Sequence, residues 1–457
     1  MIPEPALDAL RALLDRRLDA SGAARDAHAQ SESWFPPTPP DAVAWPESTE
    51  EVAAILRICA EHRVPVVGWG AGTSLEAQAL AVRGGLCLDF TRMNRVLEVR
   101  PEDMLARVQP GVTRRQLDAE LRQSGLFFPV DPGADATIGG MAATRASGTT
   151  TVRYGSMRDN VAALEVVLAD GRVIRTGSAA RKSAAGYDLT ALMLGSEGTL
   201  GLITELTLRL HGRPEAVSAA VAAFDDIGAA VETVIATIQS GLVPARMEFI
   251  DAATARAVNA YSHTDLPESA HLLVEFHGSP ARVAEEAEAF GALVREFGGQ
   301  GYAWSAREEE RSRLWRARHH AYWAILASRP GARAIVTDIC VPISRLAEAV
   351  TETRADIDAS PIEGPILGHV GDGNFHAILL IDPGDEAQLA AAKALAERMA
   401  ERALRLGGTI TGEHGVGLGK AALLRREHGP AVEVMAAIKR TLDPAGILNP
   451  GKIFTGN

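Results

Sequence analysis

The sequence predicts an α+β protein of two main domains, and three observations lead to this fold class. The chain has 457 residues, and at roughly 150 residues per domain this length favours two or three domains. Glycine-marked loops and short strands fill the first part of the chain, to about residue 213. Beyond it, strand-like and helix-like segments alternate in an order that favours a mostly antiparallel sheet flanked by helices.

The first domain is expected to begin with a helix and an arm. Leucines at helical spacing predict an amphipathic helix over 5–20, and a polar segment ending in PPTPP follows as a linker or wrapped arm. Ser48 and Glu51 form a capping-box pattern at the head of the next helix. The other expected elements are strands at 42–45, 64–67, 85–110, 161–177 and 199–210, and helices at 48–61 and 112–124.

The second domain is expected to alternate between strands and helices. Its longest predicted helix ends at Gly407-Gly408, a typical helix stop. The expected strands are 216–223, 269–276, 333–341, 365–370 and 375–381. The expected helices are 225–240, 279–297, 307–327, 344–357 and 385–406.

The composition excludes several classes of protein. A net charge of -12 argues against nucleic acid as the main partner, because phosphate binding needs a basic surface. Three cysteines are too few for a disulfide framework or a cysteine-ligated iron–sulfur cluster. No apolar stretch approaches ~18 residues, so no transmembrane helix is expected. With no recognisable targeting segment, we expect a cytoplasmic protein, with peripheral contact at the inner membrane left open.

A glycine-rich loop follows the strand predicted at 64–67. The pattern Gly68-x-Gly70-x-Gly72 suggests a Rossmann dinucleotide site at first. A Rossmann crossover needs a helix of ~10 residues or more, and the chain before Gly84 leaves room for about one turn. A surface turn and a backbone cradle for a pyrophosphate remain as alternatives, the second with the hydroxyl groups of Thr73 and Ser74 as donors.

Three further segments marked by glycine favour the cradle. They lie at 137–144, at Arg153-Tyr154-Gly155 and at 195–201. Any one of them is explained by tight packing, but four such loops in one domain favour a large, extended ligand.

A histidine pair gives the strongest chemical signal in the second domain. Gly-Asp-Gly-Asn forms a turn between two apolar strands, which brings His369 and His376 together. Glu413 follows a strand-like segment at 408–411. Two histidines and a carboxylate make a three-ligand metal set that leaves positions for a substrate. The alternative is a hairpin pair that is simply packed or hydrogen-bonded.

Three long segments carry a family resemblance. PVVGWGAGTSLEAQAL, the segment 131–177 and GYDLTALMLGSEGTLGLITELTLRL resemble the FAD-binding domain of the vanillyl-alcohol oxidase/p-cresol methylhydroxylase (PCMH) flavoprotein superfamily. Within it the chain is most similar to the FAD-linked D-2-hydroxyacid dehydrogenases, in particular the D-lactate dehydrogenase (cytochrome) group. The resemblance runs from about residue 40 to LDPAGILNPGKIF near the end.

The resemblance implies a division into domains and a set of cofactor contacts. It implies an N-terminal helix and arm at 1–36, a PCMH-type FAD-binding domain at 37–213 and a substrate and metal domain at 214–457, of which 414–457 packs back on the FAD domain. The implied FAD contacts are Gly70, Ala71, Gly72, Thr73, Ser74, Pro132, Gly133, Thr137, Gly139, Gly140, Ala143, Thr144, Gly198, Ile203 and Asn449. No histidine lies between His62 and His211, so we expect non-covalent FAD.

The resemblance also implies roles in the second domain. His369, His376 and Glu413 would bind a divalent metal, zinc or manganese, and His414 would be the general base. Arg318 matches the arginine that binds the substrate carboxylate, although a solvated basic helix face is the alternative.

The implied activity is oxidation of a small D-2-hydroxy acid, such as D-lactate, to the 2-oxo acid by hydride transfer to flavin N5. Electrons would pass to a cytochrome, a quinone or an electron-transfer flavoprotein, and a homodimer would not be surprising. The alternatives are a glycolate oxidase-type subunit of a complex, a non-catalytic FAD-binding partner subunit, and a redox-neutral relative of alkylglycerone-phosphate synthase.

Overall fold

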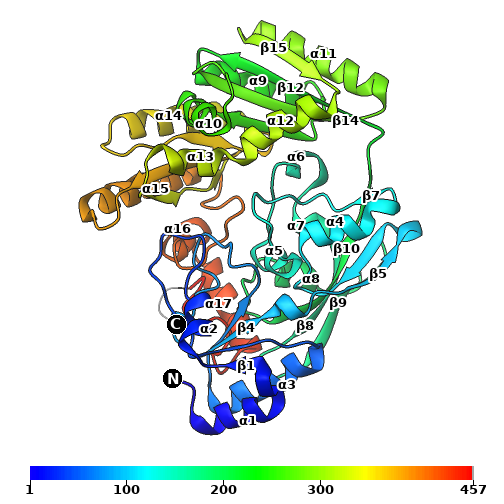
Figure 1. Ribbon diagram of the computed structural model, residues 1–457, viewed down its shortest axis with the longest axis vertical. Coiled ribbons are helices and arrows are strands. Elements are labelled where there is room, and N and C mark those ends of the chain that lie inside the picture. The colour runs from blue at the N-terminus through cyan, green and yellow to red at the C-terminus, as the bar shows by residue number, and fades with distance from the viewer. Residues whose placement is uncertain (455–457) are drawn as a thin grey trace. The chain divides into compact units, whose positions relative to one another are not determined.

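The computed structural model describes residues 1–454 and divides into two compact units (Figure 1). The first unit consists of residues 1–147, 155–213 and 413 onward, and the second of residues 148–154 and 214–412. The chain therefore leaves the first unit twice, and its C-terminal segment belongs to the unit in which the chain began.

The first unit contains a small mixed sheet that positions the glycine loop. Its strand order is β1-β2-β4-β3, and the pairs β2–β4 and β3–β4 are parallel. The strands are β1 (Leu18–Asp19), β2 (Ala42–Ala44), β3 (Val66–Trp69) and β4 (Leu86–Asp89). The chain between β3 and β4 contains no helix. The Rossmann alternative is therefore excluded by the structure.

A second sheet of the first unit has five antiparallel strands in the order β5-β6-β10-β8-β9. These strands are β5 (Val96–Arg100), β6 (Leu105–Val108), β8 (Val161–Val167), β9 (Val173–Gly177) and β10 (Leu202–Arg209). A short pair joins β7 (Leu126–Phe127) to β11 (His211–Gly212). The helices are α1 (Glu4–Leu14), α2 (Gly22–Ala27), α3 (Thr49–His62), α4 (Arg114–Glu120), α5 (Ile138–Thr144), α7 (Met157–Asn160), α8 (Leu189–Met193), α16 (Ala421–His428) and α17 (Ala431–Leu442).

The core of the first unit is aliphatic, and both ends of the chain contribute to it. Leu10 of α1 and Leu448 belong to one buried cluster, and neither side chain is exposed. Val66 of β3 forms a parallel bridge with Leu448, which places the C-terminal segment beside the strand that carries the glycine loop.

The second unit is built on an eight-stranded sheet in which neighbouring strands pair antiparallel. The order is β15-β12-β14-β13-β18-β19-β16, and β17 also pairs with β19. The strands are β12 (Ala216–Phe224), β13 (Arg246–Ile250), β14 (Ala270–Gly278), β15 (Gln300–Ser305), β16 (Arg333–Val336), β17 (Ile339–Cys340), β18 (Ile366–Gly368) and β19 (Asn374–Ile381).

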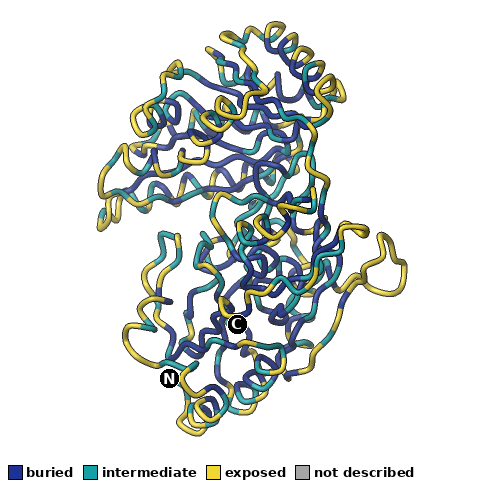
Figure 2. The backbone as a smooth tube through the Cα atoms, turned by 45° about the vertical axis from the view of Figure 1, so that its right-hand side comes forward, coloured by how far each residue is buried: buried dark blue, intermediate teal, exposed yellow. Residues whose placement is uncertain are grey.

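Helices flank this sheet, and buried backbone, drawn dark blue, runs through the interior of the unit (Figure 2). Every residue of β19 is buried, and β14 is buried except for its last residue, as expected for central strands of a covered sheet. The helices are α6 (Thr151–Tyr154), α9 (Ile227–Gln239), α10 (Ala252–Ser262), α11 (Pro280–Glu296), α12 (Glu308–His319), α13 (Ala321–Ser328), α14 (Leu346–Asp358) and α15 (Glu386–Arg405).

Several expected elements differ from the observed ones. The expected strand 333–341 is interrupted at Thr337 and Asp338, and the expected helix 307–327 divides at His320 into α12 and α13. The first helix ends at Leu14, because Asp15 adopts a positive φ of 48°. The expected strand 408–411 is reduced to one bridge between Cys340 and Thr409.

Candidate active site

The predicted FAD segments of the first unit contact one another. A Cβ added to Gly70 would lie 2.2 Å from the hydroxyl oxygen of Thr137, so the glycine loop and the start of α5 are in close approach. Thr137 caps α5 by accepting a hydrogen bond from the Gly140 amide at 3.2 Å. A Cβ on Gly139 would lie 2.4 Å from Pro110, so this glycine is also required by helix packing.

One polar atom in the glycine loop is consistent with a bound phosphate. The hydroxyl oxygen of Ser74 is buried, and no group in the described part of the chain forms a hydrogen bond with it. Gly72, two residues earlier, has φ +71°, and a Cβ there would lie 2.6 Å from the Trp69 ring. A glycine loop with a buried hydroxyl donor fits the pyrophosphate of FAD.

The loop at 195–201 lies against α5. The amides of Gly195 and Glu197 donate to the carbonyls of Ala142 and Ala143, at 3.0 and 2.8 Å. Asn449 donates from its side chain to the carbonyls of Gln78 and Glu197, at 2.9 and 2.7 Å. Asn449 therefore joins two of the predicted FAD segments.

The remaining predicted FAD residues are less constrained. Ala71 and Gly133 are exposed, Pro132 is half-buried, and a Cβ on Gly133 would meet nothing within 4 Å. Ile203 is buried in an apolar cluster. The half-buried residues are Thr73, Ala143, Thr144 and Gly198.

In the second unit, both predicted metal-binding histidines have one ring nitrogen engaged. His369 bonds through Nδ1 to the carboxylate of Glu248 at 2.7 Å, and His376 through Nδ1 to the carbonyl of Thr337 at 2.9 Å. The ring centroids are 5.6 Å apart. A proton on each Nδ1 leaves the Nε2 lone pair as the donor atom for a metal.

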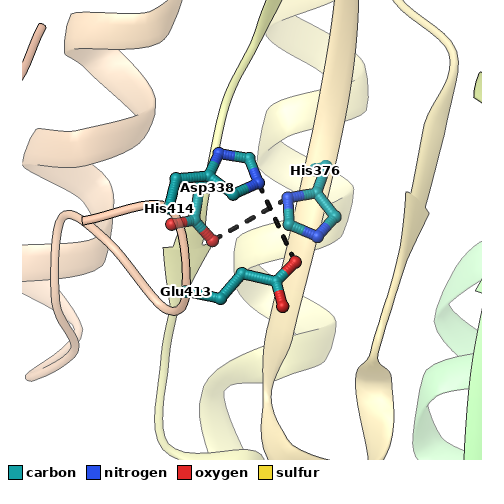
Figure 3. A group of neighbouring side chains, drawn as sticks. All are labelled: Asp338, His376, Glu413 and His414. Carbon is teal, nitrogen blue, oxygen red and sulfur yellow. Dashed lines mark ion pairs between the residues drawn. The ribbon is translucent and has the colours of Figure 1, made fainter. Parts of the chain in front are cut away.

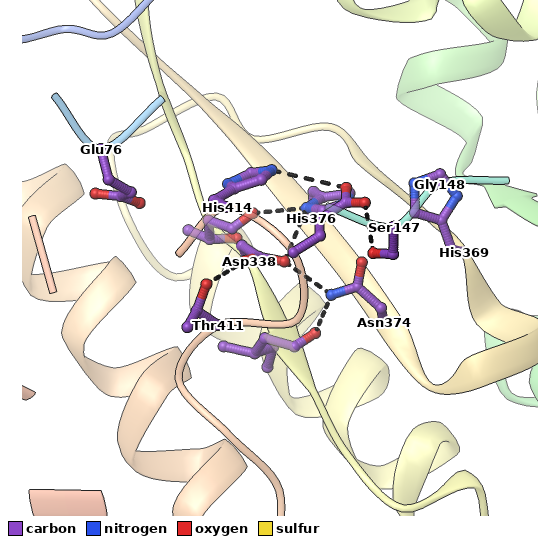
Figure 4. A network of polar contacts seen from close by, with 12 residues as sticks. Glu76, Ser147, Gly148, Asp338, His369, Asn374, His376, Thr411 and His414 are labelled. Carbon is purple, nitrogen blue, oxygen red and sulfur yellow. Dashed lines mark hydrogen bonds and ion pairs between the residues drawn. The ribbon is translucent and has the colours of Figure 1, made fainter. Parts of the chain in front are cut away.

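Asp338 is a candidate ligand that the sequence did not reveal. It lies in the break between β16 and β17, and its side chain is 0% exposed. Its carboxylate accepts hydrogen bonds from the side chains of Asn374 at 2.9 Å and Thr411 at 2.7 Å (Figure 4). It also lies 3.8 Å from Nδ1 of His376.

Four side chains form a group suited to a cation. Glu413 and His414 are the first two residues after the second unit along the chain. One potential ligand atom from each of Asp338, His376, Glu413 and His414 lies within 4.8 Å of the others (Figure 3). His369, the third predicted ligand, is not in this group. Imidazole and carboxylate donors in this number suit zinc or manganese.

Arg318, the predicted substrate residue, is buried rather than solvated. It pairs with Glu248 at 2.5 Å, and Glu248 also holds His369. Burial alone would raise the pKa of Glu248, but Arg318 and His369 outweigh it and hold the pKa below its usual range. Nε of Arg318 is buried and bonds to no described group, so the guanidinium keeps a donor for a substrate carboxylate.

The sequence also did not reveal a series of hydrogen-bonded side chains in this unit. Tyr154 bonds to Nδ1 of His277 at 2.7 Å, and Nε2 of His277 bonds to Glu275 at 2.8 Å. Alternation along β14 places Glu275 and His277 on one face of the sheet, but only the fold reveals that Tyr154 joins them.

The fold and these side chains define a flavoenzyme of the PCMH type. Residues 213–453 match the family "FAD linked oxidases, C-terminal domain", and residues 40–177 match "FAD binding domain". The chain therefore belongs to the FAD-linked oxidases and is an FAD-dependent oxidoreductase, which confirms the predicted family and fold class.

Curated relatives agree with this family. "Probable D-lactate dehydrogenase, mitochondrial" of Danio rerio is 48% identical over 96% of this chain and 89% of its own length. "D-lactate dehydrogenase [cytochrome], mitochondrial" of Arabidopsis thaliana is 43% identical over 99% of this chain and 80% of its own length. "Glycolate oxidase subunit GlcD" of Bacillus subtilis is 39% identical over 91% of this chain and 89% of its own length.

Solved structures share the fold at low sequence identity. An alkyldihydroxyacetonephosphate synthase matches 98% of this chain and 86% of its own chain, with TM-score 0.77 and 21% identity. A substrate-bound p-cresol methylhydroxylase matches 99% of this chain and 97% of its own, with TM-score 0.76 and 18% identity.

The expectation of a cytoplasmic protein is wrong. The relatives from Danio rerio, Arabidopsis thaliana and Saccharomyces cerevisiae are all named as mitochondrial proteins. That expectation came from the lack of a recognisable targeting segment, and composition adds nothing to it, because an ordinary acidic composition is compatible with many compartments. Among the described residues, no helix is long and apolar enough to cross a membrane.

Proposed function

We propose that this enzyme oxidises a small D-2-hydroxy acid, D-lactate or a close analogue, to the 2-oxo acid with non-covalent FAD and a divalent metal. The observation that carries the proposal is the group of Asp338, His376, Glu413 and His414, which joins a cation site to a candidate base. Relatives named D-lactate dehydrogenase support the substrate.

The proposed division of labour follows the two predicted domains. The FAD domain at 37–213 binds the flavin, and the domain at 214–457 supplies the substrate and metal residues, of which Glu413 and His414 belong to the first unit. When bound, FAD accepts a hydride at N5, and the divalent metal lowers the pKa of the substrate hydroxyl. His376 and Glu413 hold the metal together with Asp338, and His369 is the further histidine at the site.

Proton transfer and substrate orientation fall to two residues. His414 accepts the hydroxyl proton, because a neutral imidazole is a side chain well suited to act as a base near neutral pH. Arg318 binds the carboxylate through its remaining guanidinium donors, while Glu248 keeps it oriented. Electrons then leave to an external acceptor, and the word cytochrome in relatives' names supports a cytochrome before a quinone or an electron-transfer flavoprotein.

A glycolate oxidase-type subunit is the second candidate, because the Bacillus subtilis relative carries that name. Such a subunit works within a complex, whereas the leading proposal needs only an acceptor. Purification of the native protein with its partners separates the two, since a stable complex containing an iron–sulfur subunit favours the second.

The test of the proposal is an anaerobic titration of the purified, flavin-loaded protein with D-lactate and with L-lactate. We expect bleaching of the visible flavin absorption by the D isomer alone, and loss of that bleaching after chelator treatment. Restoring Zn²⁺ or Mn²⁺ should restore it. Flavin that no 2-hydroxy acid bleaches, in metal-loaded protein, would overturn the proposal in favour of the non-catalytic partner subunit.

A further inference from the structure

We infer that Glu197 is a positioning residue that ties the segment 413–417 to the flavin loops, so that FAD binding and metal binding support each other. The inference rests on the proposed function of Glu413 and His414. It concerns contacts within the first unit, because Glu197 and residues 413–417 both belong to it.

The carboxylate of Glu197 holds the backbone just beyond His414. Its two oxygens accept hydrogen bonds from the amides of Val416 at 2.7 Å and Gly417 at 2.9 Å. The approach is close, since a Cβ on Gly415 would lie 2.5 Å from one of these oxygens, and Gly415 has φ +79°. The segment fits against Glu197 only because a glycine stands at this position.

Gln78 holds the same segment from another side. Its side-chain amide donates to the carbonyl of His414 at 2.6 Å. The neighbouring carbonyl of Glu76 accepts from the Leu418 amide at 2.9 Å. Backbone at His414 and just after it is therefore anchored, which restricts the directions in which the imidazole can point.

Glu197 is itself fixed by the predicted flavin segments. Its amide donates to Ala143 of α5 at 2.8 Å, and its carbonyl accepts from Asn449 at 2.7 Å. Its φ of +52° is a left-handed value that a non-glycine residue rarely adopts. The surrounding contacts maintain this conformation, and it directs the carboxylate to the segment 413–417.

The arrangement has a thermodynamic consequence. A flavin that orders the loops at 137–144 and 195–201 also orders Glu197, and hence the backbone that carries Glu413 and His414. Because coupling between two binding sites is reciprocal, metal binding must strengthen flavin binding by the same factor. The predicted coupling is a tighter metal affinity in the flavin-loaded protein than in the stripped protein.

The experiment measures Mn²⁺ affinity of the full chain by metal titration, with and without FAD. Glu197→Gln replaces one acceptor oxygen by an amide, which cannot accept from the backbone. We expect Glu197→Gln to fold, to retain FAD and to bind Mn²⁺ about 10–100-fold more weakly, as is typical for residues that orient ligands. It should also bind Mn²⁺ equally well with and without FAD, whereas the wild type should differ.

Asp443→Asn is the matched control. Asp443 is another buried carboxylate of the first unit that accepts from two backbone amides, those of Ile447 at 3.0 Å and Leu448 at 2.8 Å, and it also pairs with Lys439. Among the described residues, none of these bonds reaches 413–417. It should lower stability and leave Mn²⁺ affinity unchanged. Gln78→Met is the second variant if Glu197→Gln does not fold, and it should weaken Mn²⁺ binding in the same direction.

Suppose that the wild type binds Mn²⁺ and that a hydroxy acid reduces its flavin, as the proposed function requires. Two results would then overturn the inference about Glu197 and leave the proposed function standing. One is wild-type Mn²⁺ affinity in the folded variants Glu197→Gln and Gln78→Met. The other is an equal loss of affinity in Asp443→Asn, which would make the effect a general loss of stability. A wild type that binds no Mn²⁺ would overturn the proposed function and this inference together.

Discussion

Two fully buried glutamates, one in each unit, face opposite electrostatic conditions. Glu197 of the first unit accepts hydrogen bonds from backbone amides, and burial raises its pKa to about 7 despite those bonds. Glu248 of the second unit contacts Arg318 and His369, which outweigh burial and lower its pKa. At Glu197 the backbone amides hold a chain segment against the carboxylate without offsetting the effect of burial on its pKa, whereas at Glu248 the neighbouring Arg318 and His369 do offset it.

The largest expected effect comes from removing the negative charge of Glu248 in the second unit. Glu248→Ala leaves Arg318 buried without its counter-ion, and breaking a buried pair in this way costs about 3–5 kcal/mol. Urea unfolding should show this loss. The double variant Glu248→Met with Arg318→Met should recover most of it, and a double variant as unstable as the single one would show that the pair is not the cause.

A smaller effect is expected at Asp338, whose carboxylate accepts hydrogen bonds from the side chains of Asn374 and Thr411. Asn374→Ala removes the donor at 2.9 Å from its carboxylate and should cost about 1–3 kcal/mol, because a buried acceptor is left short of a partner. It should also weaken Mn²⁺ binding. Asn259→Ala, which removes a bond to the Leu266 carbonyl elsewhere in the same unit, should lower stability and leave Mn²⁺ binding intact.

The smallest expected effect concerns a third buried carboxylate, that of Asp89, whose partner is a histidine that can gain or lose a proton. His28 bonds to Asp89 at 3.0 Å in the first unit. Burial alone would lower the pKa of His28, but the bonds to Asp89 and to the Ala24 carbonyl raise it, and the pKa of Asp89 is lowered in spite of burial.

The pH dependence of this pair follows from the two directions. The contribution of His28 is present below its unfolded pKa of about 6.5 and is lost as pH rises through the raised folded value. The contribution of Asp89 is present above about 3.9 and is lost as pH falls through the lowered value. Melting temperatures from pH 5 to 9 should therefore fall more steeply in the wild type than in His28→Gln. Parallel curves would contradict the pair's role.

The sequence revealed those parts of the site that depend on local spacing. The turn between β18 and β19 brings His369 and His376 together because the two strands are adjacent in the chain. The missed partners depend on long-range packing. Glu248 lies on β13, within a segment that received no expected element, and it meets Arg318 only through the sheet and α12.

Asp338 was missed for a different reason. The segment 333–341 is apolar and β-branched enough to be interpreted as one strand, and nothing local marks the break that turns this carboxylate toward His376. Asp251 did offer a signal, since it caps α10 by accepting from the Thr254 amide at 2.8 Å. A search for caps would have found that helix.

Because the C-terminal segment returns to the first unit, the core of that unit can be completed during synthesis only after the second unit has been made. Residues 214–412 of the second unit have all been made before Leu448, which shares a core with Leu10. At translation rates of about 5–20 residues per second, Leu10 must therefore wait until the whole second unit has been made before it can meet Leu448. Until then that half-built core exposes apolar surface, so the nascent flavin unit depends on protection from aggregation while the second unit folds.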